Sequence, residues 1–176
     1  ILSGQMKILN AGSENLKILL IGSSYSGYNK MPNILKSIAE NEGKSVSIEE
    51  YLHYGRSLYE ISQISDFESK LTSEKWDYIF LQDSPHRIAY PKTFSQMLPR
   101  SDPHPVSVTL EKVKDITIEN YNKTNVVYFM PWAFKDGMLW VPGQNDDFFR
   151  MQEKIYRNSI ELTKELKIQL APVGWS

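Results

Sequence analysis

The stretch Lys17-Ile-Leu-Leu-Ile-Gly-Ser-Ser-Tyr-Ser-Gly27 joins a short apolar run to a turn rich in serine and glycine. An apolar run of this length, closed by a glycine, is typical of a strand that is buried on both faces of a sheet. Four more segments with strand character follow along the chain, at residues 46–52, 76–81, 125–130 and 168–173. The sequence therefore predicts five strands, and the serine-rich turn follows the first of them.

Segments with helical spacing separate these strands. Pro32 suits the first turn of a helix and Gly43 suits its end, and the apolar residues between them repeat at helical spacing. A weaker helical stretch is expected to end near Leu71, and further helices are expected over residues 106–121 and 146–166. Five prolines lie between residues 85 and 105, which is too many for one regular element, so the segment from His86 onward is predicted to run over the surface.

Strands that alternate with helices predict an α/β fold with a five-stranded parallel sheet, because parallel neighbours need crossover connections. The chain of 176 residues has the size of one domain, so we expect residues 1–176 to form a single unit. In open sheets of this kind, ligands bind beyond the carboxyl ends of the strands. The loops at that edge are therefore the place to look for chemistry.

Composition narrows the classes of partner. The chain carries 20 basic and 21 acidic residues, so its net charge of −1 provides no field that would gather nucleic acid. No apolar stretch is long enough to cross a bilayer, and we expect a soluble protein without a membrane partner. The absence of cysteine excludes disulfides and thiolate chemistry but leaves the compartment open, cytoplasmic or secreted after loss of a signal peptide. No set of His, Asp and Glu residues has the spacing of a metal site.

Three loops at the predicted edge carry candidate catalytic groups. Ser24 lies in the turn after the first strand, where a hydroxyl can attack while nearby amides face the same space. Gly55 follows the second strand, and its missing side chain lets a backbone N–H approach a ligand. Gln82 follows the third strand directly, and its amide can donate to an oxyanion. Each has an ordinary explanation as turn chemistry, but together they fill the positions of an acyl-transfer site.

These residues resemble those of the SGNH (GDSL-like) hydrolases, in the branch whose first strand ends in a Gly-Asn-Ser-type block. The resemblance includes residues 18–26, Met31-Pro32, residues 76–82 and Ala171-Pro-Val-Gly174. It implies a flavodoxin-like three-layer α/β/α sandwich and a serine esterase that needs no cofactor. Ser24 would be the nucleophile and supply one oxyanion donor through its own N–H, with Gly55 and Gln82 as the other donors. The implied substrate is a small O-acyl ester, such as an acetylated carbohydrate or another polar alcohol.

The sequence departs from the family pattern in three places. Ser23 stands where an acidic or amide residue usually precedes the nucleophile, and residues 81–84 read Leu-Gln-Asp-Ser instead of Gly-x-Asn-Asp. The third departure is the general base, which the resemblance places in a C-terminal Asp-x-x-His segment, whereas no histidine follows His104. We therefore expect the catalytic segment to lie beyond Ser176. Asp83-Ser-Pro-His86 has the spacing by coincidence, and His53 is interpreted as an ordinary loop residue.

Three further interpretations remain open from the sequence. Residues 24–29, Ser-Tyr-Ser-Gly-Tyr-Asn, also resemble a flavodoxin phosphate loop, which would make the protein an FMN- or phosphate-binding protein. Bound flavin would colour the preparation yellow. A catalytically inactive relative that retains a carbohydrate or acyl ligand is another alternative. Trp132, Phe134 and Trp140 follow the fourth strand and form either an aromatic wall for such a ligand or ordinary loop packing. Asp146 and Asp147 are expected to provide the N-terminal charges of the last helix.

Overall fold

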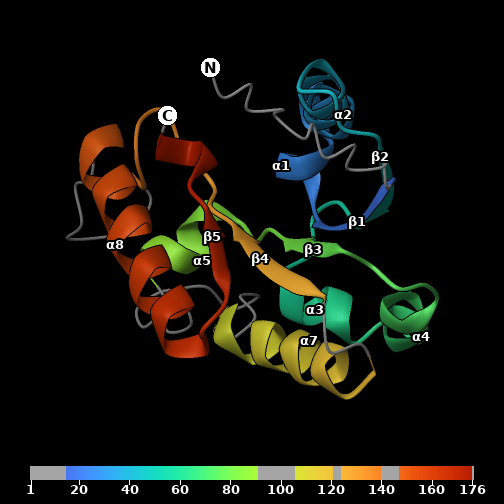
Figure 1. Cartoon of the computed structure of the whole chain (residues 1–176). Helices are drawn as coiled ribbons and strands as arrows, with labels where there is room; N and C mark the ends of the chain where they lie inside the picture. The colour runs from blue at the N-terminus through green and yellow to red at the C-terminus, as the bar shows by residue number, and fades with distance from the viewer. Residues whose placement is uncertain (1–14, 91–105, 121–123, 140–146, 176) are drawn as a thin grey trace, which may run out of the picture.

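The computed structural model describes residues 15–90, 106–120, 124–139 and 147–175. Strands and helices alternate along it, as the apolar runs predict (Figure 1). The strands are β1 (Leu16–Gly22), β2 (Val46–Leu52), β3 (Tyr78–Leu81), β4 (Asn125–Phe129) and β5 (Gln169–Ala171). The helices are α1 (Ser24–Gly27), α2 (Met31–Asn41), α3 (Leu58–Ser62), α4 (Phe67–Thr72), α5 (Pro85–Ala89), α7 (Val106–Asn120) and α8 (Phe148–Leu166), with short 3-10 turns η1 (Tyr28–Lys30) and η2 (Val173–Trp175).

All five strands are parallel and lie in the order β2-β1-β3-β4-β5. Helices cover both faces of the sheet, with α2 on one side and α3, α4 and α7 on the other (Figure 1). The predicted α/β class and its five-stranded parallel sheet are confirmed. Because β1 pairs with both β2 and β3, the turn after β1 lies between the turns that follow those two strands.

The main core lies on the face that α3, α4, α7 and α8 cover. Side chains alternate between the two faces of a strand, so Leu19 and Ile21 of β1 enter this core while the intervening Leu20 is buried on the face that carries α2. Tyr128 of β4 is the largest side chain that is fully buried in this core. The first strand is therefore packed on both faces, which fixes the position of the turn that follows its carboxyl end.

Helix ends follow the sequence signals closely. Pro32 occupies the first turn of α2, and Gly43 follows its end with a φ of +72°, a conformation that glycine adopts without strain. Asp147 caps α8 by accepting a hydrogen bond of 2.9 Å from the Arg150 N–H, whereas Asp146 lies outside the described residues. The apolar stripe of α2 predicted the helix correctly. It did not predict how exposed the stripe is: Ile34 and Ile38 are each more than half exposed.

The prediction of a surface segment from His86 onward is wrong for its first residues. Pro85 begins the short helix α5, in which Arg87, Ile88 and Ala89 are buried. Contacts with α8 hold this helix, including a 2.7 Å hydrogen bond from the Asn158 side-chain amide to the Ile88 carbonyl. A proline at the first position of a helix costs no hydrogen bond, so Pro85 begins the helix here. Residues 91–105, with the other prolines and His104, lie outside the described part.

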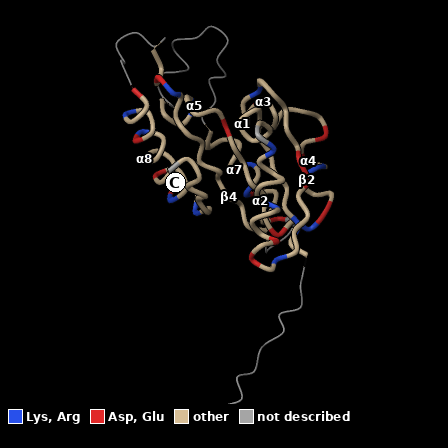
Figure 2. The backbone as a smooth tube through the Cα atoms, turned by 90° about the horizontal axis from the view of Figure 1, so that it is seen from above, with Lys and Arg blue, Asp and Glu red and all other residues tan. Residues whose placement is uncertain are grey.

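Charges of both signs are interspersed along α8 and around α2 and α4 (Figure 2). In the described ranges, no helix combines the length and the apolar character that crossing a membrane requires.

Candidate active site

The turn after β1 presents Ser24 at the carboxyl edge of the sheet. Ser23 is buried and caps α1, and its carbonyl accepts hydrogen bonds from the amides of Ser26 and Gly27 at 3.1 and 3.2 Å. Ser24 is the first residue of α1 and is only half-buried, and no described group hydrogen-bonds its hydroxyl. The turn therefore satisfies its own backbone through Ser23 and leaves the hydroxyl of Ser24 available for reaction.

A buried hydrogen bond fixes this turn to the end of β3. The Ser26 hydroxyl donates to Gln82 Oε1 at 3.0 Å, and both side chains are almost completely inaccessible to water. Gly22 makes this contact close, because a Cβ at that position would stand 2.7 Å from Ser26 Oγ and 3.3 Å from Gln82 Oε1. The missing side chain of Gly22 thus allows the first and third strand ends to meet.

The turn after β2 approaches from the other side. The His53 N–H donates to the Gly22 carbonyl at 2.9 Å, which continues the pairing of the strands into the loop. Gly55 follows with a φ of +75°, in the left-handed region that glycine adopts without strain. A Cβ at Gly55 would meet no atom within 4 Å, so the backbone there faces open space. The predicted role of the Gly55 N–H as a donor is compatible with this open space.

The strand order brings the loops of Ser24, Gly55 and Gln82 to one edge of the sheet. The side chain of Gln82 is 1% exposed, with Oε1 accepting from Ser26 and Nε2 donating to the Asp83 carbonyl. One N–H of that amide is used by the Asp83 carbonyl, and an amide nitrogen carries two. The roles of the three residues as nucleophile and oxyanion donors stay predictions.

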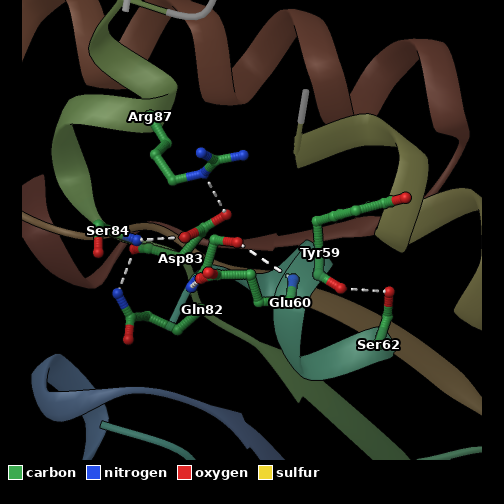
Figure 3. Close-up of polar contacts among 8 residues, drawn as sticks. Tyr59, Glu60, Ser62, Gln82, Asp83, Ser84 and Arg87 are labelled. Atoms are coloured by element: carbon green, nitrogen blue, oxygen red, sulfur yellow. Dashed lines mark hydrogen bonds and ion pairs between the residues drawn. The ribbon is translucent and has the colours of Figure 1, made fainter. Parts of the chain in front are cut away.

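Asp83 and Arg87 form a buried ion pair directly behind this edge (Figure 3). Arg87 Nε lies 3.1 Å from Asp83 Oδ2, with the side chains 7% and 0% exposed. The carboxylate also accepts hydrogen bonds from the amides of Ser84, at 2.7 Å, and of Leu58 at the start of α3. Burial raises the pKa of Asp83, against the lowering effects of Arg87 and the two amides. Asp83 therefore ties the loops after β2 and β3 together.

His86 stacks on an aromatic side chain from the loop after β4. Its ring centroid lies 6.1 Å from that of Phe134, with 24° between the ring planes. Burial, together with the neighbouring charge of Arg87, lowers the pKa of His86 to about 4. A histidine with that pKa is a weak base at neutral pH. The interpretation of Asp83-Ser-Pro-His86 as a coincidental match stays a prediction.

The depressed pKa of His86 predicts a loss of stability in acid. The unfolded chain takes up this proton near pH 6.5 and the folded chain only near pH 4, so the free energy of unfolding falls as the pH drops through that window. Between pH 8 and pH 4 this contributes about 3 kcal/mol. We expect His86→Phe to remove that contribution, as measured by urea unfolding at both values. Equal pH dependence in the variant and the wild type would contradict the assignment.

Aromatic side chains from the loops after β1 and β4 meet beside Ser24. The ring of Tyr25, the next residue, lies 5.4 Å from that of Trp132 and 6.3 Å from that of Phe134. Burial raises the pKa of the Tyr25 hydroxyl. Trp132 and Phe134 thus line one flank of the turn of residues 23–27, which we name the nucleophile turn after the role predicted for Ser24. The wall hypothesis requires this position, whereas Trp140 lies outside the described residues.

Sequence reasoning did not find three features of this edge. The contact between Tyr25 and Trp132 was not predicted, because local sequence patterns carry no information about residues so far apart in the chain. The Asp83–Arg87 pair has the i,i+4 spacing of a helical ion pair, but its burial depends on tertiary packing. Gly174 packs against the Pro131 carbonyl and the Trp132 amide so tightly that a Cβ would overlap them.

A separate hollow of about 200 Å³ lies at the opposite edge of the sheet. Its lining includes Thr124 and Asn125 at the start of β4 and Gln169 at the start of β5. Ligands of open parallel sheets bind at the carboxyl ends of the strands, so this hollow is not the site of the predicted chemistry.

Several solved structures that resemble this chain in fold are described as SGNH hydrolases or esterases. A protein from Slackia heliotrinireducens assigned to the SGNH hydrolases has a TM-score of 0.63 and 16% identity, over 89% of this chain and 78% of that one. AlinE4, an SGNH-hydrolase family esterase, has a TM-score of 0.60 and 16% identity, over 92% of this chain and 78% of its own. The acetyl xylan esterase AlAXEase has a TM-score of 0.53 and 14% identity, over 88% and 76%. No family model matches the chain, and no curated protein sequence does.

The fold expected from the sequence resemblance is therefore confirmed: this chain has the α/β fold of the SGNH hydrolases. Identities of this size establish the fold alone, and the chemistry has to be argued from the residues at the carboxyl edge.

Proposed function

We propose that the protein is a serine esterase that hydrolyses a small O-acyl ester of a carbohydrate or another polar alcohol. The observation that carries this proposal is the half-buried Ser24, which is held at the carboxyl edge of β1 with its hydroxyl outside every described hydrogen bond. The likeness in fold to SGNH esterases, among them an acetyl xylan esterase, supports the same reaction class.

The proposed reaction proceeds in two steps. Ser24 Oγ attacks the ester carbonyl carbon, and the oxyanion accepts hydrogen bonds from the N–H groups of Ser24 and Gly55. The resemblance offers the side-chain amide of Gln82 as a third donor, and this buried amide would have to turn toward the substrate to serve as one. Collapse of the tetrahedral intermediate breaks the bond to the alcohol and leaves an acyl-Ser24. Water then attacks the acyl group, and the carboxylic acid is released with Ser24 restored.

The proposal requires a base that takes the proton from Ser24 and delivers it to the departing alcohol. His86 has a pKa of about 4, which makes it a weak base at neutral pH. The ring of His53 packs edge-on against that of Tyr51, with the ring centroids 4.6 Å apart. We choose neither histidine as the base. We propose that the base is the histidine of an Asp-x-x-His segment, as the family resemblance implies.

Covalent labelling tests the position of the nucleophile. A fluorophosphonate reacts with an activated serine hydroxyl, so we expect full-length protein that hydrolyses p-nitrophenyl acetate to take up one label per chain. Peptide mass spectrometry should locate that label on Ser24. Heat-denatured protein is the control, because it no longer holds the donors in place. A label on Ser23 or Ser26, or turnover without any label, would refute the assignment.

A further inference from the structure

The aromatic side chains that remain exposed gather at the edge that carries Ser24. Tyr28, Tyr54, Trp132 and Phe149 are the large aromatic residues more than a third exposed in the described part of the chain. Tyr28 and Tyr54 follow β1 and β2, and Trp132 follows β4. Phe149 is the second residue of α8, and this end of the helix lies beside the same edge. Gln152 of α8 accepts a hydrogen bond of 2.8 Å from the N–H of Ala133, which follows β4. Scattered exposed aromatics need no explanation, but a concentration at a single edge points to a ligand.

Two pairs of rings stand on opposite sides of the nucleophile turn. Tyr28 and Tyr54 are 63% and 56% exposed, with ring centroids 5.7 Å apart. On the other side, Trp132 is 37% exposed and lies against Tyr25. Tyr54 follows β2 and Trp132 follows β4, and the strand order β2-β1-β3-β4 separates these two strands by three strand spacings, which is about 14 Å. The strand that precedes Ser24, β1, lies between them in the sheet.

The backbone holds both pairs in place. A Cβ at Gly27 would overlap the hydroxyl end of Tyr54, so this ring rests directly on the nucleophile turn. Gly174 packs with the same closeness on the backbone of Pro131 and Trp132. Both aromatic pairs are therefore attached to the site by contacts that leave no room for another atom.

The chemistry of these surfaces favours a sugar chain. A pyranose ring carries C–H groups on its faces and hydroxyls around its rim, so a flat aromatic ring can cover a face while the hydroxyls stay in water. A long acyl chain gains free energy in proportion to the apolar area removed from water, and rings this exposed would leave much of such a chain in water. We infer that the alcohol part of the substrate is an oligosaccharide, held by Tyr28–Tyr54 on one side of Ser24 and by Tyr25–Trp132 on the other. This inference rests on the proposed esterase function for the reaction at Ser24.

Binding can be measured without turnover. In full-length Ser24→Ala protein, calorimetric titration with xylohexaose and cellohexaose should give a dissociation constant at least tenfold lower for one of them than for its monosaccharide. Tyr54→Ala and Trp132→Ala should each weaken hexasaccharide binding about tenfold and leave monosaccharide binding within twofold. Ile118→Ala is the matched control, because Ile118 is 53% exposed but lies at the end of α7, beside the hollow at the opposite edge.

A second variant keeps the test decisive if an aromatic substitution disturbs folding. Gly27→Ala should push Tyr54 aside and weaken hexasaccharide binding, and the double variant Gly27→Ala/Tyr54→Ala should bind no more weakly than Tyr54→Ala alone. Equal affinity for mono- and hexasaccharides, or hexasaccharide binding that none of these substitutions changes, would overturn the inference. Hydrolysis of p-nitrophenyl acetate is measured separately, on the protein that retains Ser24. Failure of the proposed esterase activity and failure of the proposed oligosaccharide binding therefore give different results.

Discussion

Replacement of Ser24 by alanine is expected to lower kcat for ester hydrolysis by about 10⁴-fold or more, since removal of a catalytic-triad member has effects of this size. The variant keeps the fold, because Ser24 is half-buried and its hydroxyl makes no hydrogen bond with the described residues. Its thermal unfolding midpoint should stay within about 2 °C of the wild type, which corresponds to about 0.5–1 kcal/mol. The measurement is initial-rate hydrolysis of p-nitrophenyl acetate by full-length protein.

Ser37→Ala provides the matched control for this experiment. Ser37 is an exposed serine on α2, away from the turn, and its loss should leave kcat within twofold of the wild type. A Ser24→Ala protein that retains more than a tenth of wild-type kcat would show that another group performs the attack.

Breaking the buried ion pair of Asp83 and Arg87 is expected to have the largest effect on folding. Removal of one partner of a buried pair typically costs about 3–5 kcal/mol. The two single substitutions should differ, because a guanidinium keeps its proton whereas a carboxyl can gain one. Asp83→Leu leaves a buried positive charge without its carboxylate, and we expect it to lower the free energy of unfolding by about 4 kcal/mol at pH 7. Arg87→Met leaves a carboxyl whose pKa burial already raises, and we expect a smaller loss.

The pH dependence of the Arg87→Met protein provides a second measurement. A carboxyl with a raised folded-state pKa binds its proton more tightly in the folded chain than in the unfolded one, so stability recovers as the pH falls through that pKa. Urea unfolding at pH 7 and pH 5 should show Arg87→Met recovering part of its loss relative to the wild type, while Asp83→Leu shows no such recovery. Equal losses for both variants at both pH values would contradict this account of the pair.

The strands were predictable because each is a short apolar run between turn residues. Leu19 and Leu20 face opposite sides of the sheet and both are fully buried, which is why the first run lacks alternation. Boundaries were less accurate: the third strand begins at Tyr78, and Trp76 is buried before it with its indole N–H directed at the Lys70 carbonyl. A buried indole and a buried strand residue look alike in a sequence, since both are apolar.

The helix after β3 and the aromatic contacts were not predictable in the same way. Ile88 and Ala89 are buried by contact with α8, which is distant in the sequence, and the proline-rich composition of their neighbourhood indicated the opposite. The position of Gln82 at the edge was predicted, but its burial against Ser26 was not, because a glutamine after a strand can turn inward or outward. Local patterns thus locate the candidate residues, whereas tertiary packing decides the direction of their side chains.

The nucleophile turn is fixed by the Ser26–Gln82 hydrogen bond between two strand ends, while Tyr54 and Trp132 stand on the loops after the flanking strands. Surface loops accept insertions and substitutions more readily than the elements they join. Under the proposed function, a natural or designed descendant of this chain can alter the loops that carry Tyr54 and Trp132, and with them the range of esters it accepts, without rebuilding the turn of residues 23–27. Selectivity and reaction would then evolve separately.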